Sequence, residues 1–278
     1  MFNGRKLLIV TKHSKEKVIA PILEKELGVE CIVYDNFDTD ELGTFTGEVD
    51  REHDPLETAR QKCLQALAQS SFDLAVASEG SFGPHPSIPF AHADDEILYF
   101  MDKKNDLDIF VRVITPETNF NARKIMTSAE LKEFSKQIKF PSHAVIIKKE
   151  QHNFDEMVKG INDSKKLMDV FNYFCEAFGG AYLETDMRAM HNPTRMQTIE
   201  KATQKLATKI NHVCPTCNTP GLGITSIKEG LRCSLCNRPT RSTLSYLYEC
   251  QKCNFIKEEM FPNHKEKEDP MYCDFCNP

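Results

Sequence analysis

Four pairs of cysteines lie near the end of the chain, and the members of each pair are separated by two residues. The pairs are Cys214/Cys217, Cys233/Cys236, Cys250/Cys253 and Cys273/Cys276. Two thiolates at this spacing occupy one side of a tetrahedral metal ion, and a second pair completes its four ligands. Fifteen residues separate the first two pairs and 19 separate the last two, within the interval of about 15–20 residues typical of zinc sites. The spacing therefore predicts two bound zinc ions.

The four C-x-x-C pairs can combine around the two ions in a sequential or an interleaved order. The expected one is sequential, with residues 214, 217, 233 and 236 on one ion and residues 250, 253, 273 and 276 on the other. An interleaved arrangement is the alternative. In either case four thiolates leave no position for water, so both ions are expected to be structural rather than catalytic. The tail has few large apolar side chains and is expected to need zinc in order to fold.

The charge balance of the tail bears on its partners. From Asn211 onward, eight basic and eight acidic side chains cancel, and each zinc held by four thiolates adds two negative charges. Affinity for nucleic acid depends on a surplus of basic side chains that displace counterions. The tail is therefore expected to dock a protein or to give structural support, and nucleic-acid binding is the weaker alternative.

Net charge, the length of apolar runs and the first residues of the chain indicate the general class of protein. The 278 residues carry a net charge of -6, no apolar run approaches the length of a membrane span, and no secretory signal is evident. A cytoplasmic location without disulfides is the expectation. The cysteines outside the tail are expected to be small buried apolar residues; they are Cys31, Cys63 and Cys175.

Polar residues follow an apolar run near the N-terminus. Lys6–Val10 is predicted to be a strand, and the segment Thr11-Lys12-His13-Ser14-Lys15-Glu16-Lys17 leads from it into a helix. Anions bind at helix N-termini, and ligands of α/β sheets gather where strands end. Thr11, Lys12, Lys15 and Lys17 are therefore candidate phosphate contacts. A solvated first turn is the alternative explanation.

A second candidate group opens the next helix, which Asp54 and Pro55 are expected to start. Glu57 is a possible magnesium ligand and Lys62 a possible phosphate contact. A capping box formed by Asp54 and Glu57 explains equally well why a glutamate occurs at position 57. Residues 57 and 62 flank the apolar stripe on opposite sides, so one ligand can reach both only across the start of the helix.

Two further segments complete the candidate site. The predicted loop Ser78-Glu79-Gly80-Ser81-Phe82-Gly83-Pro84 follows the strand Asp73–Ala77, which places Glu79 where it can bind a divalent ion. Arg188 and Arg195 flank Asn192, the expected N-cap of a helix over Pro193–Ile210, and can clamp phosphate. An acidic turn and a simple helix cap are the respective alternatives.

The elements that position these residues alternate between strand and helix. A hairpin is predicted over Glu96–Ile114 and helices at Thr127 and over Asp163–Phe178. The fold class is α/β, a mixed twisted sheet with flanking helices, followed by a small β-rich zinc-ribbon tail. The expected domains are residues 1–210, with a helical part over about 150–210, and the tandem four-cysteine region 211–278.

Residues 1–150 resemble the inosine-triphosphate pyrophosphatase superfamily, which includes the Maf-like nucleotide pyrophosphatases. Glu57-Thr58-Ala59-Arg60-Gln61-Lys62-Cys63 is similar to the family's Glu-Asn-Ala-x-x-Lys-Ala helix, and Ser78-Glu79-Gly80 resembles the acidic loop of its inosine/xanthosine-triphosphatase branch. The resemblance implies that Glu57 and Glu79 hold magnesium, and that Lys62 with Lys15 or Lys17 holds phosphates. The whole chain is similar to an uncharacterised bacterial family with a C-terminal double zinc ribbon.

Two functions follow as expectations. One is a magnesium-dependent nucleoside-triphosphate pyrophosphatase-like hydrolase, or a nucleotide-binding protein, with Glu57 and Glu79 as its catalytic residues. The other is a non-catalytic adaptor that senses a nucleotide or another phosphorylated small molecule and docks a protein through its zinc ribbon. No membrane partner is expected.

Overall fold

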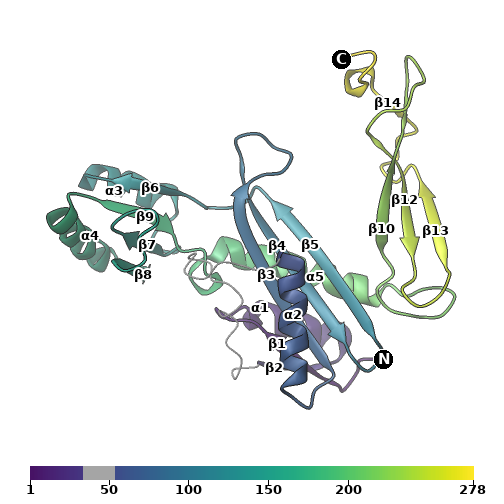
Figure 1. Ribbon diagram of the computed structural model, residues 1–278, viewed down its shortest axis with the longest axis horizontal. Coiled ribbons are helices and arrows are strands. Elements are labelled where there is room, and N and C mark those ends of the chain that lie inside the picture. The colour runs from purple at the N-terminus through teal and green to yellow at the C-terminus, as the bar shows by residue number, and fades with distance from the viewer. Residues whose placement is uncertain (34–53) are drawn as a thin grey trace. The chain divides into compact units, whose positions relative to one another are not determined.

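The structure is a computed structural model that describes residues 1–33 and 54–278 and divides into two compact units, Met1–Ala207 and Thr208–Pro278 (Figure 1). The polar loop predicted over residues 35–53, with Gly43-Thr44-Phe45-Thr46-Gly47, lies outside the described residues. The predicted fold class is confirmed: the chain is a mixed α/β protein with a β-rich, cysteine-containing C-terminal region. No helix in the described part of the chain has the length and apolarity that crossing a membrane requires.

The first unit contains a five-stranded sheet, called sheet A, with the strand order β2-β1-β3-β4-β5. Strands β1, β2 and β3 are parallel, and β3, β4 and β5 are antiparallel. The strands are β1 (Lys6–Val10), β2 (Glu30–Val33), β3 (Leu74–Pro84), β4 (His92–Asp102) and β5 (Leu107–Thr115). The mixed sheet and the β4–β5 hairpin are as predicted.

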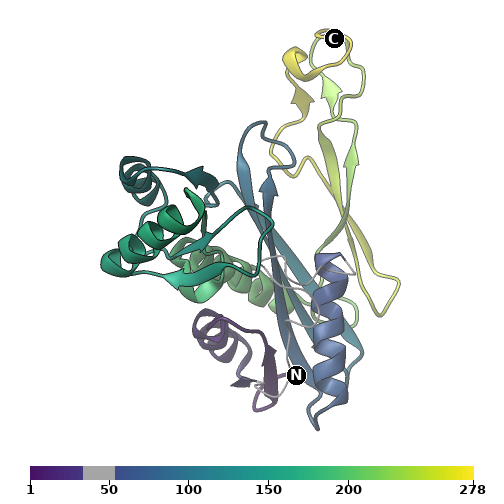
Figure 2. The same ribbon diagram turned by 60° about the vertical axis from the view of Figure 1, so that its left-hand side comes forward.

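Helices cover both faces of sheet A. Helix α2 (Pro55–Ala68) lies on one face, and α1 (Glu16–Leu27) and α5 (Pro193–Asn211) lie on the other (Figure 2). The Asp54 side chain caps α2 by accepting the N–H groups of Leu56 and Glu57, and Asn192 Oδ1 accepts the N–H of Arg195 at the start of α5. Both predicted N-caps are therefore confirmed.

Helix α1 begins at Glu16 and contains Pro21 in its interior. Proline lacks an N–H and removes one helical hydrogen bond, and the buried Ile19, Leu23 and Leu27 hold the helix against the sheet. The helix ends at Gly28, whose φ of 67° is left-handed and suits glycine.

Strand β3 is longer than predicted. The loop expected over residues 78–84 is strand instead, because every residue from Leu74 to Pro84 pairs with β4. Glu79 lies opposite Ile97 in the middle of this ladder rather than beyond a strand end. The local glycines and polar residues favour a turn, and the long antiparallel partner overrides that preference.

A second sheet of the first unit, called sheet B, has the order β6-β9-β7-β8 and is antiparallel throughout. Helix α3 (Ser128–Gln137), which begins with a Thr127/Glu130 capping box, and α4 (Ser164–Phe178) pack against it. Strands β8 and β9 and the short helix η2 lie within residues 150–210, where helices alone were expected. The remaining elements are β6 (Ala122–Ile125), β7 (Val145–Lys148), β8 (Met157–Ile161), β9 (Ala181–Thr185) and η2 (Ala189–His191).

The second unit contains an antiparallel three-stranded sheet, β10-β12-β13, and a parallel pair, β11-β14. Strands β10 and β13 are largely exposed and β12 between them is mostly half-buried, so the unit buries little apolar side-chain surface. Its elements are β10 (Ile224–Glu229), β11 (Arg232–Cys233), β12 (Thr243–Glu249), β13 (Ile256–Met260), β14 (Lys267–Glu268) and the short helix η3 (Pro270–Tyr272).

Candidate functional site

The segments singled out in the first unit meet around Ser78–Gly80 of β3. Lys15, directly before α1, donates from Nζ to the Ser78 hydroxyl at 2.9 Å, and Lys62 of α2 forms an ion pair with Glu79. All four residues are buried. Residues that are 63 and 17 positions apart in sequence are therefore held together at one stretch of the sheet.

Arg195 of α5 brings the fourth segment to the same place. It is fully buried and donates from Nε to Glu96 Oε1 and from Nη1 to the Met187 carbonyl, both at 2.6 Å. Its guanidinium lies 5.1 Å from the centroid of the Phe82 ring. A Cβ added to Gly80 would overlap Arg195 Nη2 and Glu96 Oε1, so glycine at this position makes room for the ion pair.

The alternation of side chains along β3 divides these residues between the two faces of sheet A. Gly80 lies opposite Glu96 and Phe82 opposite Asp94, and directly opposed residues of an antiparallel pair share a face. The α1/α5-face cluster comprises Lys15, Ser78, Asp94, Glu96 and Arg195. The α2-face pair comprises Lys62 and Glu79.

Both groups influence Lys15. The pKa of Lys15 is lowered to about 7, mainly by burial and also by Arg195 and Lys62, against the opposite effect of Glu96 and Glu79. Burial also raises the pKa of Asp94 to about 8, and Glu96 adds to that effect. Strongly shifted pKa values among clustered charges are typical of functional sites.

The loop before α1 has an unusual backbone. His13 and Ser14 both have left-handed φ angles, 67° and 61°, which are uncommon in residues other than glycine. Thr11 is buried and its hydroxyl donates to the Lys12 carbonyl at 2.9 Å. Lys17, by contrast, is exposed on α1, whereas Lys15 reaches the buried cluster through its hydrogen bond to Ser78.

Glu57 has different surroundings from Glu79. Its carboxylate accepts a hydrogen bond from Gln61 at 2.6 Å and lies 3.3 Å from Arg60, both within its own helix. The Glu57 side chain is 36% exposed and that of Glu79 is 5% exposed. Among the described residues, groups of three or more metal-ligating side chains are formed by cysteines, so Glu57 and Glu79 belong to no such group.

Arg188 lies beside sheet B rather than with Arg195. It forms a bidentate pair with the fully buried Asp186, at 3.0 and 2.6 Å. Asp186 also accepts the N–H of Gly160 on β8. Asp186 thus holds Arg188, and Arg195 joins the α1/α5-face cluster; the clamp of both arginines around one phosphate stays a prediction.

Two residues of that cluster, Asp94 and Glu96, were not among the predicted site residues. Both are fully buried. The sequence carries a signal for them, because the run His92-Ala93-Asp94-Asp95-Glu96 puts three acidic residues at the start of an otherwise apolar strand. Buried carboxylates in a strand are rare unless they are paired or bind a ligand.

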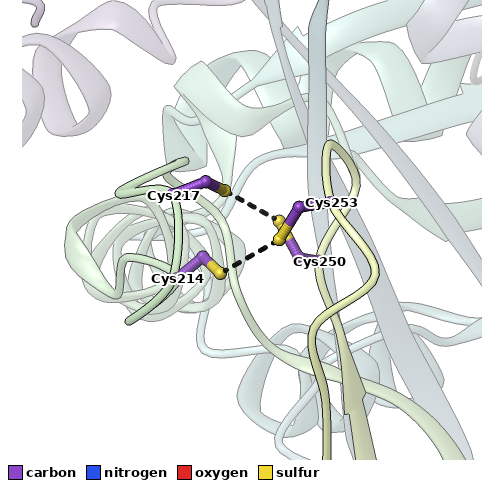
Figure 3. A group of neighbouring side chains, drawn as sticks. All are labelled: Cys214, Cys217, Cys250 and Cys253. Atoms are coloured by element: carbon purple, nitrogen blue, oxygen red, sulfur yellow. Dashed lines mark hydrogen bonds between the residues drawn. The ribbon is translucent and has the colours of Figure 1, made fainter.

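The eight cysteines of the tail form two groups of four. The first cysteine group is Cys214, Cys217, Cys250 and Cys253, whose sulfur atoms point toward one another (Figure 3). The second cysteine group is Cys233, Cys236, Cys273 and Cys276. Facing sulfur atoms lie 3.5 and 3.7 Å apart in the first group and 3.6 and 3.9 Å apart in the second.

These distances fit a tetrahedral zinc ion. Zinc–sulfur bonds of about 2.3 Å place the sulfurs of a tetrahedron about 3.8 Å from one another. In the first cysteine group, hydrogen bonding from Thr219 lowers the pKa of Cys217 to about 6. In the second cysteine group, the neighbouring thiols raise the pKa of Cys276 to about 12. All 11 cysteines are free thiols, and burial raises the pKa of Cys63 well above its usual range.

The pairing is interleaved, so the expected sequential pairing is wrong. Strand β10 starts beside the end of β12, where Ile224 faces Tyr248, and this register brings the Cys214 pair to the Cys250 pair. The parallel pair β11–β14 sets Cys233 opposite Glu268, shortly before Cys273. Strand β10 has six residues, about 20 Å when extended, and it keeps its two flanking cysteine pairs apart.

An asparagine directly follows each C-x-x-C pair, and this regularity is not contained in the cysteine spacing itself. The residues are Asn218, Asn237, Asn254 and Asn277. Asn218 and Asn237 have left-handed φ angles of 58°, and their N–H groups donate to the carbonyls of Cys214 and Cys233 at 2.9 and 3.0 Å. Asparagine tolerates this conformation better than most residues, and the turn directs both thiols to one side.

Comparison with known proteins places the chain in a family. The model described as "Domain of unknown function (DUF6671)" matches residues 62–278. The chain belongs to the DUF6671 family. No curated protein matches it. Among solved structures it is similar to protein VC0702 from Vibrio cholerae, with 12% identity, a TM-score of 0.32, and coverage of 73% of this chain and 93% of that one.

The match to a family of unknown function agrees with the predicted whole-chain likeness to an uncharacterised family. It covers the cysteine tail, α2 from Lys62 onward, and β3 and β4. The likeness of residues 1–150 to nucleotide pyrophosphatases rests on the sequence motifs alone.

Paired substitutions in this DUF6671 protein test the interleaved cysteine groups. Cys214→Ser with Cys250→Ser removes two ligands from one group, and we expect the bound zinc to fall from about two ions per chain to about one. Cys214→Ser with Cys233→Ser damages both groups and should abolish tight zinc binding. Zinc per chain is measured by mass spectrometry of the digested protein. Sequential pairing gives the opposite result for the two double variants.

Gly80→Ala tests the close packing of the Arg195–Glu96 pair against β3. The added methyl group must displace buried charged groups, and overpacking of this kind costs about 1–3 kcal/mol. We therefore expect a lower free energy of unfolding in urea. Gly83→Ala is the matched control on the same strand, because its Cβ would have nothing within 4 Å. Equal stability of the two variants would contradict the described packing.

Proposed function

We propose that the first unit binds the phosphate groups of a nucleotide or another phosphorylated small molecule, and that it is a magnesium-dependent pyrophosphatase-like hydrolase. The observation that supports the proposal most strongly is the buried Lys15, which contacts Ser78 beside Arg195 and Glu96. A buried lysine whose pKa is lowered to about 7 gains favourable interactions when an anion arrives, because the anion stabilises its charged form.

The residues of the site have distinct roles in this proposal. Lys15 and Arg195 contact phosphate oxygens, since both lie in the α1/α5-face cluster. Lys62 positions Glu79 through their buried ion pair. A magnesium ion supplies charge neutralisation and an oriented water when it is bound. Glu57 has a weaker claim as a ligand, because its carboxylate is engaged by Arg60 and Gln61 near the surface.

The second unit is proposed to fold around two zinc ions, one in each cysteine group. Four thiolates per ion leave no open position, so the ions stabilise the unit and take no part in a reaction. Their apparent binding free energy, about 10–16 kcal/mol for a structural zinc, compensates for the small apolar core of short, exposed strands.

A non-catalytic adaptor is the second candidate function. It is favoured by large exposed apolar side chains beside the second cysteine group, Leu235 (74% exposed), Met271 (59%), Tyr272 (61%) and Phe275 (59%). Exposed apolar side chains that cluster are typical of protein-docking surfaces. An adaptor binds the phosphorylated ligand without converting it.

Lys15→Met tests the phosphate site. We expect the affinity for a nucleoside triphosphate, measured by calorimetry without added metal, to fall at least tenfold. In the unmodified protein the affinity should fall as the pH rises from 7 to 9, because Lys15, with a pKa near 7, loses its charge over this range; Lys15→Met should lose that dependence. Lys25→Met, exposed near the end of α1, is the control. Unchanged affinity in Lys15→Met would rule out the site.

Incubation of the zinc-loaded protein with a panel of nucleotides and magnesium tests hydrolysis. Release of phosphate or pyrophosphate is the expected result, and Glu79→Gln should reduce the rate about 100-fold or more, because it removes a carboxylate from the buried pair with Lys62. The control is Asp163→Asn, because Asp163 is the N-cap of α4, a helix that packs against sheet B. Binding of nucleotides that all stay intact would favour the adaptor.

A further inference from the structure

Two buried carboxylates of β4, Asp94 and Glu96, lie on one face of sheet A. They are two residues apart on the strand and lie opposite Phe82 and Gly80 of β3, so both side chains belong to the α1/α5-face cluster. Both residues have 0% exposure. The neighbouring position on the strand, Asp95, faces the other way and forms a bidentate pair with Arg112.

The carboxyl oxygens of Asp94 and Glu96 are incompletely hydrogen-bonded within the described part of the chain. Glu96 Oε1 accepts from Arg195, whereas Glu96 Oε2 and both oxygens of Asp94 have no hydrogen-bond partner among the described residues. The Thr198 hydroxyl lies near enough to lower the pKa of Asp94 but does not reach hydrogen-bonding geometry. Buried carboxylate oxygens without partners are costly, and proteins retain them where a cation or ligand completes the site.

The side chains around Asp94 and Glu96 indicate which kind of ligand fits this position. Carboxylate oxygens bind hard cations, and magnesium in particular is held by one or two carboxylates together with waters and phosphate oxygens. Lys15 and Arg195, on the same face, are the side chains proposed above to contact phosphate. Two carboxylates and two cationic side chains around one position can hold a divalent cation and the phosphate that accompanies it.

We propose that Asp94 and Glu96 bind a divalent cation of the magnesium class, whose remaining positions are filled by water and by phosphate oxygens of the ligand. The identity of the phosphate ligand rests on the proposed function; the cation site itself does not. The assignment places the cation on the face of sheet A opposite to Glu57 and Glu79, the ligands that the sequence resemblance implies. His92 is exposed two residues before Asp94 on the same strand, so the site lies close to the surface at that end of β4.

Binding of Mn²⁺ to the full-length, zinc-loaded protein tests the proposal, because Mn²⁺ prefers oxygen ligands and is readily followed by paramagnetic resonance. We expect one Mn²⁺ per chain in metal-free buffer containing pyrophosphate, and at least a tenfold weaker affinity in Asp94→Asn. Asp95→Asn is the matched control and should bind Mn²⁺ like the unmodified protein. Zinc content and circular dichroism establish that each variant is folded.

Glu79→Gln separates this site from the one on the α2 face. Loss of Mn²⁺ binding in Glu79→Gln with retention in Asp94→Asn would overturn the proposal, as would the absence of Mn²⁺ binding by the unmodified protein. Nucleotide binding without metal, which tests Lys15, is measured separately. A protein that binds nucleotide but no Mn²⁺ contradicts the cation site alone, and one that binds Mn²⁺ but no nucleotide contradicts the phosphate site alone.

Discussion

The antiparallel ladder between β3 and β4 is the constraint on which the candidate site depends. It continues for eleven residues from Leu74 to Pro84, well beyond the end of the parallel part of the sheet, and it carries polar side chains into a region covered by helices on both faces. Because consecutive side chains alternate, Ser78 and Glu79 must point into different layers. Each side chain has its own partner: Lys15, directly before α1, contacts Ser78, and Lys62 of α2 pairs with Glu79.

Buried charge of this kind is a poor way to gain stability. The Arg195–Glu96 pair has no exposed surface at all, and desolvation of both ions offsets most of their attraction, so apolar residues of similar volume often serve stability as well or better. Removal of one partner is nevertheless expensive, because the other charge is left buried. The charged groups buried against β3 and β4 therefore support the proposed binding site better than they support a purely structural core.

Helix ends were predictable from the sequence because local chemistry determines them. Asp54, Thr127 with Glu130, and Asn192 each satisfy backbone N–H groups within a few residues, and no distant partner is needed. The extension of β3 was not predictable in this way, because residues 78–84 look like a turn until β4 pairs with them. Strands of four or five residues in sheet B leave too short a pattern to identify.

The convergence of Lys15, Lys62, Glu79 and Arg195 was predictable in part. Lys15 lies between β1 and α1 and Arg195 lies near the start of α5, as expected, whereas Glu79 lies within β3 and Lys62 within α2. Their division between two faces depends on the β3–β4 register, which the sequence does not specify. Asp94 and Glu96 were missed because acidic residues at the start of a strand also suit a solvated edge, and their burial beside residues such as Arg195 is a tertiary effect.

The cysteine spacing predicts which residues form the two groups but not which pairs share a group. Spacing identifies all eight ligands, but sequential and interleaved pairing differ little in chain entropy. The interleaved form closes loops of 32 and 36 residues instead of 15 and 19, which costs only about 0.5–1 kcal/mol more for each loop. That difference is small beside the free energy of zinc binding, so the register of β10 with β12 decides the pairing. Each cysteine group then joins segments from both halves of the tail.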